Sequence, residues 1–180
     1  MNITVFLGSG EGNGTILKDA VSELGSWIGE SGNTLVYGGS KTGLMGVLAD
    51  SVLCTGGHVI GVETQLFIDR GFQHTGLSEL IIAKNMAERK RKMIELGDAF
   101  IAFPGGTGTL EEISEVMSRS ALQTLHAPCI IYNLNGYYNG LKQLLAQMLE
   151  SGLSSPEKLG SIHFADNLND IRSLLHYSAG

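Results

Sequence analysis

Short apolar runs rich in β-branched residues alternate along this chain with longer helical patterns, and that alternation limits the possible folds more than any other feature. Strands are predicted at 3–7, 34–37, 58–62, 79–82, 99–103, 129–132 and 161–164. Helices are predicted at 14–30, 43–55, 86–96, 109–123, 138–151 and 167–177, and 64–77 is the longest irregular stretch. Such alternation is typical of βαβ units, which place helices on both faces of a mostly parallel sheet. We therefore expect a single doubly wound α/β domain.

Length and charge exclude several functional classes. A chain of 180 residues can build one hydrophobic core without disulfides or metals. The formal net charge of −6 argues against nucleic-acid binding, which requires clustered basic residues. No apolar run approaches the roughly 18 residues of a membrane span, and segment 3–7 lacks the basic flank of a signal peptide. We expect a cytoplasmic protein without nucleic-acid or membrane partners, in which Cys54 and Cys129 are both core residues.

Glycine is about twice as frequent as in an average protein, with 25 residues in 180, and it clusters behind predicted strands. The clusters are 8–12, 38–40 and 105–108. In an open parallel sheet the ligand crevice lies beyond the carboxyl ends of the strands. The three clusters should therefore share one edge of the sheet.

The strongest functional signal is segment 99–112, AFIAFPGGTGTLEE, in which a strand leads through a glycine-rich turn into a helix. Glycines let the backbone approach an anion, and the unpaired N–H groups and dipole of a helix N-terminus favour phosphate. The hydroxyls of Thr107 and Thr109 can donate to phosphate oxygens. In a purely structural alternative, Thr109 is the N-cap and Glu112 completes a capping box. We favour phosphate binding, because three glycine clusters converge.

A second candidate lies in segment 86–93, MAERKRKM. Met86, Arg89, Lys90 and Met93 are spaced at i, i+3, i+4 and i+7, so Arg89 or Lys90 borders the buried stripe of a helix. An arginine in that position needs a partner. An anionic ligand or a carboxylate such as Glu112 would supply one, although carboxylates in a first helical turn are also favoured by the dipole alone.

These segments resemble the Lonely Guy family. Residues 104–112 are similar to its PGGxGTxxE motif, and 86–93 to its upstream helix motif, with Arg89 and Lys90 at the Arg and Lys. Residues 36–46 resemble its second glycine loop and 135–138 its later NxxGYY stretch, so the resemblance covers about 3–153. The chain departs from the family at Ala87, where His is common, and at Gly71, where a Glu is usual. Both departures concern recognition of the base.

The resemblance implies a nucleotide-binding Rossmann-like domain over residues 1–180 that hydrolyses the N-glycosidic bond of an N6-modified adenosine 5′-monophosphate. The products would be the free base, a cytokinin, and ribose 5-phosphate, and the enzyme would be a homodimer or a larger homo-oligomer without cofactor or metal. Arg89 and Glu112 would be catalytic. The candidate substrate-binding residues are Gly105, Gly106, Thr107, Gly108, Thr109, Glu111, Lys90, Gly8, Ser9, Gly39 and Met86.

Two alternatives stay open at this point. One is a broader nucleosidase that acts on unmodified purine monophosphates. The other is a non-catalytic carrier of a phosphorylated cofactor, of the molybdenum-cofactor carrier type. Lysine decarboxylase, a label that many family members carry, is rejected, because no lysine in the sequence is marked as a pyridoxal Schiff base.

Overall fold

The computed structural model describes residues 1–177, and side chains as far as residue 175; positions 178–180 of the predicted domain lie outside the described residues. One sheet in the described chain contains β1 (Asn2–Phe6), β2 (Thr34–Tyr37), β3 (His58–Thr64), β4 (Glu79–Ala83), β5 (Ala99–Ala102), β6 (Cys129–Tyr132) and β7 (Ile162–Ala165). The helices are α1 (Ile16–Glu30), α2 (Gly43–Cys54), α3 (Gln65–Asp69), α4 (Met86–Leu96), α5 (Thr107–Ala121), α6 (Asn139–Glu150), α7 (Pro156–Leu159) and α8 (Leu168–Tyr177), with a 3-10 turn, η1 (Leu134–Gly136).

The seven strands of the described sheet run parallel in the order β4-β3-β2-β1-β5-β6-β7. From β1 the chain moves outward through β2, β3 and β4, and then returns to the other side of β1 with β5. Ile3 pairs there with Ala99, and Phe6 with Ala102. Strand order reverses between β1 and β5, and in open parallel sheets this is where a ligand crevice forms. The predicted doubly wound α/β fold is confirmed.

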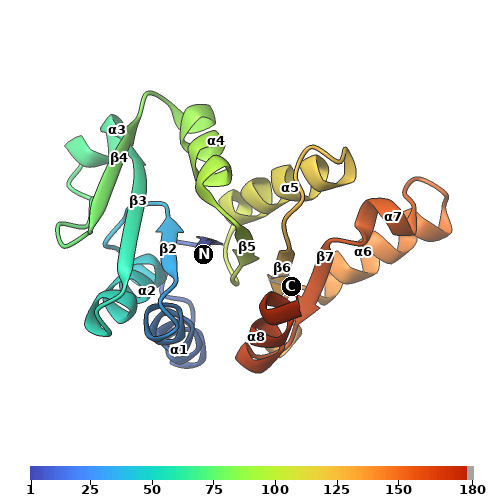
Figure 1. Cartoon of the computed structure of the whole chain (residues 1–180), viewed down its shortest axis with the longest axis horizontal. Helices are drawn as coiled ribbons and strands as arrows, with labels where there is room; N and C mark the ends of the chain where they lie inside the picture. Colours follow the sequence, from blue (N-terminus) through green and yellow to red (C-terminus); the bar gives the residue numbers. More distant parts are fainter. Residues whose placement is uncertain (178–180) are drawn as a thin grey trace.

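Helices cover both faces of the sheet (Figure 1). Alternate residues of a strand point to opposite faces, so β1 and β5 each contribute to two cores. Val5 and Ile101 pack in the core beneath α1, α2 and α8. Phe6 and Phe100 belong to the other core, which includes Met93 of α4, and their rings stack with centroids 6.3 Å apart. The two cores hold the strand ends, and therefore the loops that follow them, in fixed positions.

The structure corrects three sequence expectations. Helix α3 lies within the stretch 64–77 that was expected to be irregular; at five residues it is too short to show helical periodicity. Helix α5 begins at Thr107, two residues before the predicted start at 109, after an extended N-cap, Gly106, and this also excludes the alternative of a capping box at Thr109. Cys129 is buried as expected, but Cys54 is exposed, because it is the last residue of α2.

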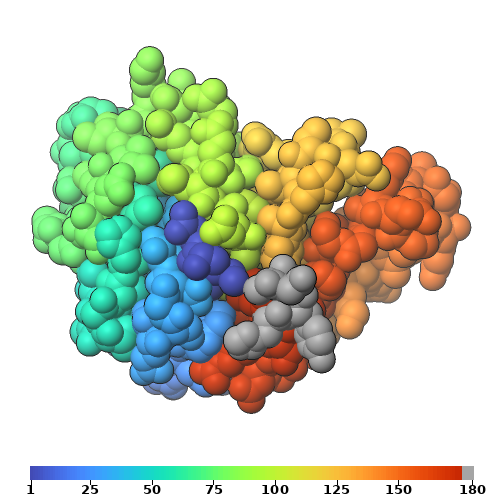
Figure 2. Space-filling view, viewed as in Figure 1, coloured from blue at the N-terminus to red at the C-terminus, as the bar shows by residue number. Residues whose placement is uncertain are grey.

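The segment with α6 and α7 forms one end of the long axis of the molecule and extends from the main body in the space-filling view (Figure 2). Two of its leucines, Leu144 and Leu153, have exposed side chains. None of the helices in residues 1–177 is both long and apolar enough to cross a membrane.

Candidate functional site

A cavity of about 570 Å³ lies beyond the carboxyl ends of β1, β2, β3 and β5. The loops after these strands and the first turns of α4 and α5 form its walls. The lining residues are Leu7, Gly8, Ser9, Gly10, Ser40, Thr42, Met45, Glu63, Phe67, Phe72, Met86, Arg89, Gly106, Thr107, Gly108, Thr109 and Glu112. Parts of all three predicted glycine clusters therefore meet at one edge of the sheet.

One end of the cavity is formed by the start of α5 and the loop after β1. The N-cap of α5, Gly106, supplies no side-chain cap, so the first N–H groups of the helix are not satisfied by a capping side chain. The two loops touch: a Cβ on Gly8 would lie 3.5 Å from Cα of Gly105. A Cβ on Gly105 would overlap the hydroxyl of Thr109. Glycine at both positions allows the loops to close around a small space lined by backbone.

The Thr109 hydroxyl is sealed from solvent, and its Oγ1 has no hydrogen-bond partner within residues 1–177. An unpaired buried hydroxyl costs about 1–3 kcal/mol, which a bound acceptor would recover. Thr109 lines the cavity beside the unsatisfied helix N-terminus, and that terminus favours a bound anion such as phosphate. The covered Oγ1 can reach a phosphate oxygen only when the atoms around it move.

Two tyrosines of the 135–138 stretch bind the backbone of this loop from outside the cavity. The Tyr137 hydroxyl donates to the carbonyl oxygen of Gly105 at 2.6 Å, and the Tyr138 hydroxyl donates to that of Phe103 at 2.9 Å. The side-chain oxygen of Asn133 accepts from the backbone N–H of Tyr138 at 2.7 Å. These contacts occupy loop carbonyls and leave the N–H groups of the loop for an anion.

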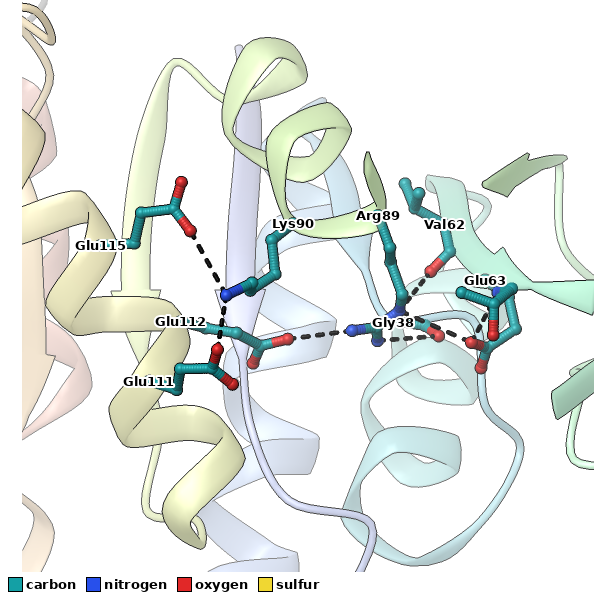
Figure 3. A network of polar contacts seen from close by, with 9 residues as sticks. Gly38, Val62, Glu63, Arg89, Lys90, Glu111, Glu112 and Glu115 are labelled. Atoms are coloured by element: carbon teal, nitrogen blue, oxygen red, sulfur yellow. Dashed lines mark hydrogen bonds and ion pairs between the residues drawn. The ribbon is translucent and has the colours of Figure 1, made fainter. Parts of the chain in front are cut away.

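The side chain of Arg89 is buried and lines the cavity, and it lies within a network of polar contacts (Figure 3). Its Nε donates to the carbonyl of Val62 at 2.9 Å, and its Nη2 to that of Gly38 at 3.2 Å. A Cβ on residue 38 would overlap Nη2, so glycine makes room for the guanidinium. Nη1 donates to Oε1 of Glu112 at 3.0 Å, which confirms the expected pairing of this arginine with a carboxylate.

A second carboxylate, Glu63, approaches the same guanidinium, with its Oε1 3.5 Å from Nε of Arg89. Burial raises the pKa of Glu63 and of Glu112, and the charge of Arg89 opposes that rise. When both carboxylates are ionised, the three side chains together carry one negative charge. Fixed negative charge in a water-poor cavity can stabilise positive charge that develops on a bound substrate.

Four sequence candidates lie outside the cavity lining, namely Lys90, Glu111, Gly105 and Gly39. Lys90 Nζ is 2.6 Å from Oε1 of Glu111 and 3.5 Å from Oε2 of Glu115, and its hydrogen bond with Glu111 raises its pKa. Gly39 has a φ of +79° and packs against Glu63. A direct part for these four in substrate binding stays a prediction. The other candidates, from Gly8 to Glu112, line the cavity.

Sequence reasoning missed Glu63, Phe67 and Phe72. Glu63 ends an apolar strand, and a lone carboxylate there matches no motif. Phe67 and Phe72 belong to the stretch 64–77, which was expected to be irregular, and their ring centroids are 6.3 Å apart. An acidic residue at the carboxyl end of an apolar parallel strand was the available signal.

Comparisons with known proteins agree with the geometry. Residues 45–175 match a family described as possible lysine decarboxylase. The chain is 42% identical over 157 residues to the cytokinin riboside 5′-monophosphate phosphoribohydrolase of Rhodococcoides fascians, covering 86% of this chain and 79% of that protein. It is 40% identical over 154 residues to an Arabidopsis thaliana enzyme of that description, covering 86% and 72%.

Solved structures with the same fold include the molybdenum cofactor binding protein of Rippkaea orientalis, with a TM-score of 0.74 and 21% identity over 99% of this chain and 97% of that one. The molybdenum cofactor carrier protein of Chlamydomonas reinhardtii has a TM-score of 0.73 and 17% identity over 99% and 97%. At these identities the similarity shows the fold alone.

Proposed function

We propose that this chain, which belongs to the Lonely Guy family of cytokinin riboside 5′-monophosphate phosphoribohydrolases, hydrolyses the N-glycosidic bond of an N6-modified adenosine 5′-monophosphate. One observation carries the proposal: a glycine-rich helix N-terminus without a side-chain cap and a buried Arg89–Glu112 pair line the same cavity. Among the residues that the structure describes, no lysine lines that cavity, whereas a pyridoxal-dependent decarboxylase holds its cofactor through a lysine Schiff base.

The 5′-phosphate binds at the start of α5. Backbone N–H groups at 106–109 contact its oxygens, and Gly8 and Ser9 close the other side. Phosphate binding far from the reacting bond fixes the position of C1′ and converts binding energy into orientation. A nucleoside without the phosphate should therefore be a poor substrate.

The reaction breaks the C1′–N9 bond and joins a water oxygen to C1′, while the proton released from that water balances the charge of the departing base. Positive charge develops on the sugar in the transition state, as in other glycoside hydrolyses. Glu112 stabilises that charge and orients the water. Arg89 stabilises the negative charge of the leaving purine; it acts electrostatically, because a guanidinium does not give up its proton at neutral pH.

A homodimer or larger homo-oligomer is part of the proposal. It is supported by exposed leucines on α5, α6 and the segments after them, which would be shielded in an assembly: Leu110, Leu122, Leu144 and Leu153. A cytoplasmic location is also proposed, since both cysteines are free thiols, as expected in a reducing compartment. Light scattering of the purified protein would measure the assembly.

Release of free base, followed by chromatography, tests the reaction. The substrates are N6-isopentenyl-AMP, AMP and N6-isopentenyladenosine without phosphate. Base from the modified monophosphate and none from the nucleoside is the expected result. Equal rates on both monophosphates would favour the broader nucleosidase. If no substrate releases base and a phosphorylated ligand copurifies with the protein, the carrier alternative replaces the proposal.

A further inference from the structure

Glu63 is a buried carboxylate in the cavity wall to which the proposed reaction assigns no role. Its Oε1 accepts from the backbone N–H of Thr64 at 2.9 Å and faces Nε of Arg89 at 3.5 Å. Among the described residues Oε2 has no hydrogen-bond partner, yet it is not one of the atoms sealed from solvent. Because Glu63 lines the cavity, the open oxygen is available to a ligand there.

The strand order places Glu63 at the end of the cavity opposite the phosphate loop. β3 is separated from β5 by β2 and β1, which at about 4.8 Å per strand corresponds to roughly 14 Å. Glu112, Arg89 and Glu63 follow one another between these ends (Figure 3). Phe67 and Phe72, from the segment after β3, line the same cavity and offer aromatic faces. A nucleotide anchored by its phosphate extends its sugar to Glu112 and its base to Glu63.

Arg89 and Glu63 together present donors beside an acceptor. A guanidinium has five N–H donors, and three of those of Arg89 have acceptors in Val62, Gly38 and Glu112. The two remaining N–H groups, one on Nη1 and one on Nη2, have no acceptor among the described residues, and the carboxylate of Glu63 lies on the Nε side of the same guanidinium. A 6-aminopurine edge carries an N6–H donor next to a ring-nitrogen acceptor, which is the complementary pattern. A 6-oxopurine has an acceptor at position 6, which would face the carboxylate.

We propose that Glu63 determines base specificity by accepting a hydrogen bond from N6–H of a 6-aminopurine, with Arg89 donating to the adjacent ring nitrogen. This rests on the proposed function and defines its substrate class. Adenine with one N6 substituent keeps one N6–H and is accepted. Adenine with two N6 substituents, and hypoxanthine, cannot donate from position 6 and are rejected.

The test compares kcat/KM for AMP, IMP and N6,N6-dimethyl-AMP in the wild type, in Glu63→Gln and in a control. Wild-type protein should prefer AMP over the other two by roughly 10- to 100-fold, the discrimination of a two-point base contact. Glu63→Gln keeps the side-chain shape and adds an NH2 donor, so the AMP-to-IMP ratio should fall to about one or invert. Glu79→Gln, an exposed glutamate on β4, should keep the wild-type ratio.

A loss of rate that is equal for all three nucleotides in Glu63→Gln would show a merely structural role and overturn the proposal, as would a wild type without preference. If Glu63→Gln does not fold, Glu63→Asp replaces it. The side chain of Asp is shorter by one methylene, so this variant should also lose the preference for AMP over IMP and N6,N6-dimethyl-AMP. If wild-type protein releases no base at all, the proposed function fails. Calorimetric affinities for AMP and IMP in the same variants then test base recognition on their own.

Discussion

Arg89 and Lys90 are consecutive residues of α4, and they form ion pairs with two consecutive glutamates of α5. Arg89 pairs with Glu112 and Lys90 with Glu111, but the two pairs have different surroundings. Arg89 and Glu112 have side chains that are 8% and 12% exposed, and both line the cavity. Lys90 and Glu111 are 17% and 65% exposed and lie outside the lining. Successive helical residues point about 100° apart, so one pair faces the cavity and the other the surface.

The two ion pairs are alike in their pairing and differ in burial and in the number of acceptors around the cation. We expect this difference, and not the pairing, to separate a charge that acts in the reaction from a surface contact. Two backbone carbonyls and two carboxylates surround Arg89, and without it each of these four groups would lose a donor or a counter-charge. Lys90 holds only exposed or half-exposed carboxylates, which water can solvate in its absence. The following predictions test this contrast.

Arg89→Ala should have the largest effect. It leaves Glu63 and Glu112 as buried, uncompensated carboxylates, and loss of one member of a buried ion pair costs about 3–5 kcal/mol of unfolding free energy. Base release should fall by roughly 10³-fold or more, because transition-state electrostatics are lost as well. Urea unfolding and base release measure the two effects. Equal losses in Arg89→Ala and Lys90→Ala would contradict the contrast between the pairs.

Glu112→Gln should reduce kcat by roughly 10²- to 10³-fold, the usual effect of removing one electrostatic group from an active site. The folding stability should change less than in Arg89→Ala, since the amide keeps the shape and Glu63 still balances the arginine. Glu111→Gln is the matched control, and its rate should stay within about twofold of wild type. Steady-state kinetics on N6-isopentenyl-AMP measure kcat in both variants. A larger loss of kcat in Glu111→Gln than in Glu112→Gln would assign the catalytic role to Glu111.

The pH dependence of kcat/KM should follow the buried carboxylates. Burial raises the pKa of Glu112 above its ordinary value of 4.5, so activity that needs the ionised form is lost as the pH falls through that raised pKa. The acid limb should fall by about tenfold per pH unit and be missing from the residual activity of Glu112→Gln. A limb that survives in Glu112→Gln would assign the titration to another group.

The same raised pKa acts in the opposite sense on stability. The folded protein holds the Glu112 proton more tightly than the unfolded chain does, so binding of this proton adds to the free energy of unfolding. That stabilisation is complete below pH 4.5, the ordinary pKa, and is lost as the pH rises from there through the raised pKa of the folded protein. Urea unfolding of wild type and Glu112→Gln across this range measures the difference. Wild type should lose stability relative to the variant as the pH increases.

Lys90→Ala should have the smallest effect. Exposed ion pairs contribute about 0.2–1 kcal/mol, and salt screens them further. Base release should change by no more than about twofold, and the difference in unfolding free energy should shrink in 1 M salt. A loss of substrate affinity beyond tenfold would show that Lys90 contacts the substrate directly.

The sequence predicted the sheet, most helices and the neighbourhood of the site, because buried parallel strands appear as short apolar runs and the longer helices show a period of 3.6 residues. Arg89 was found through its spacing to Met86 and Met93, which placed it on the border of a buried stripe. The helix start at Thr107 was missed because a threonine followed by glutamate three residues later imitates a capping box, whereas Gly106 caps through its backbone alone.

Glu63 was missed for a different reason. Its significance depends on Arg89, a residue far along the chain, which reaches Val62 and Glu63 only after α4 has packed on the sheet. Tyr137 and Tyr138 were recognised as part of a motif, but their role appears only in their bonds to the carbonyls of Gly105 and Phe103. Long-range partners of this kind have no local pattern.

The pairing of β1 with β5 has a consequence for how the protein is made. Ile3 must find Ala99 before the glycine loops that follow the two strands can meet, and such distant contacts form late because closing a long loop costs entropy. A nascent chain on the ribosome therefore has no phosphate site until β5 and the start of α5 have emerged. Nucleotide present during refolding should bind only near the end of the folding reaction. It should therefore slow unfolding more than it speeds folding.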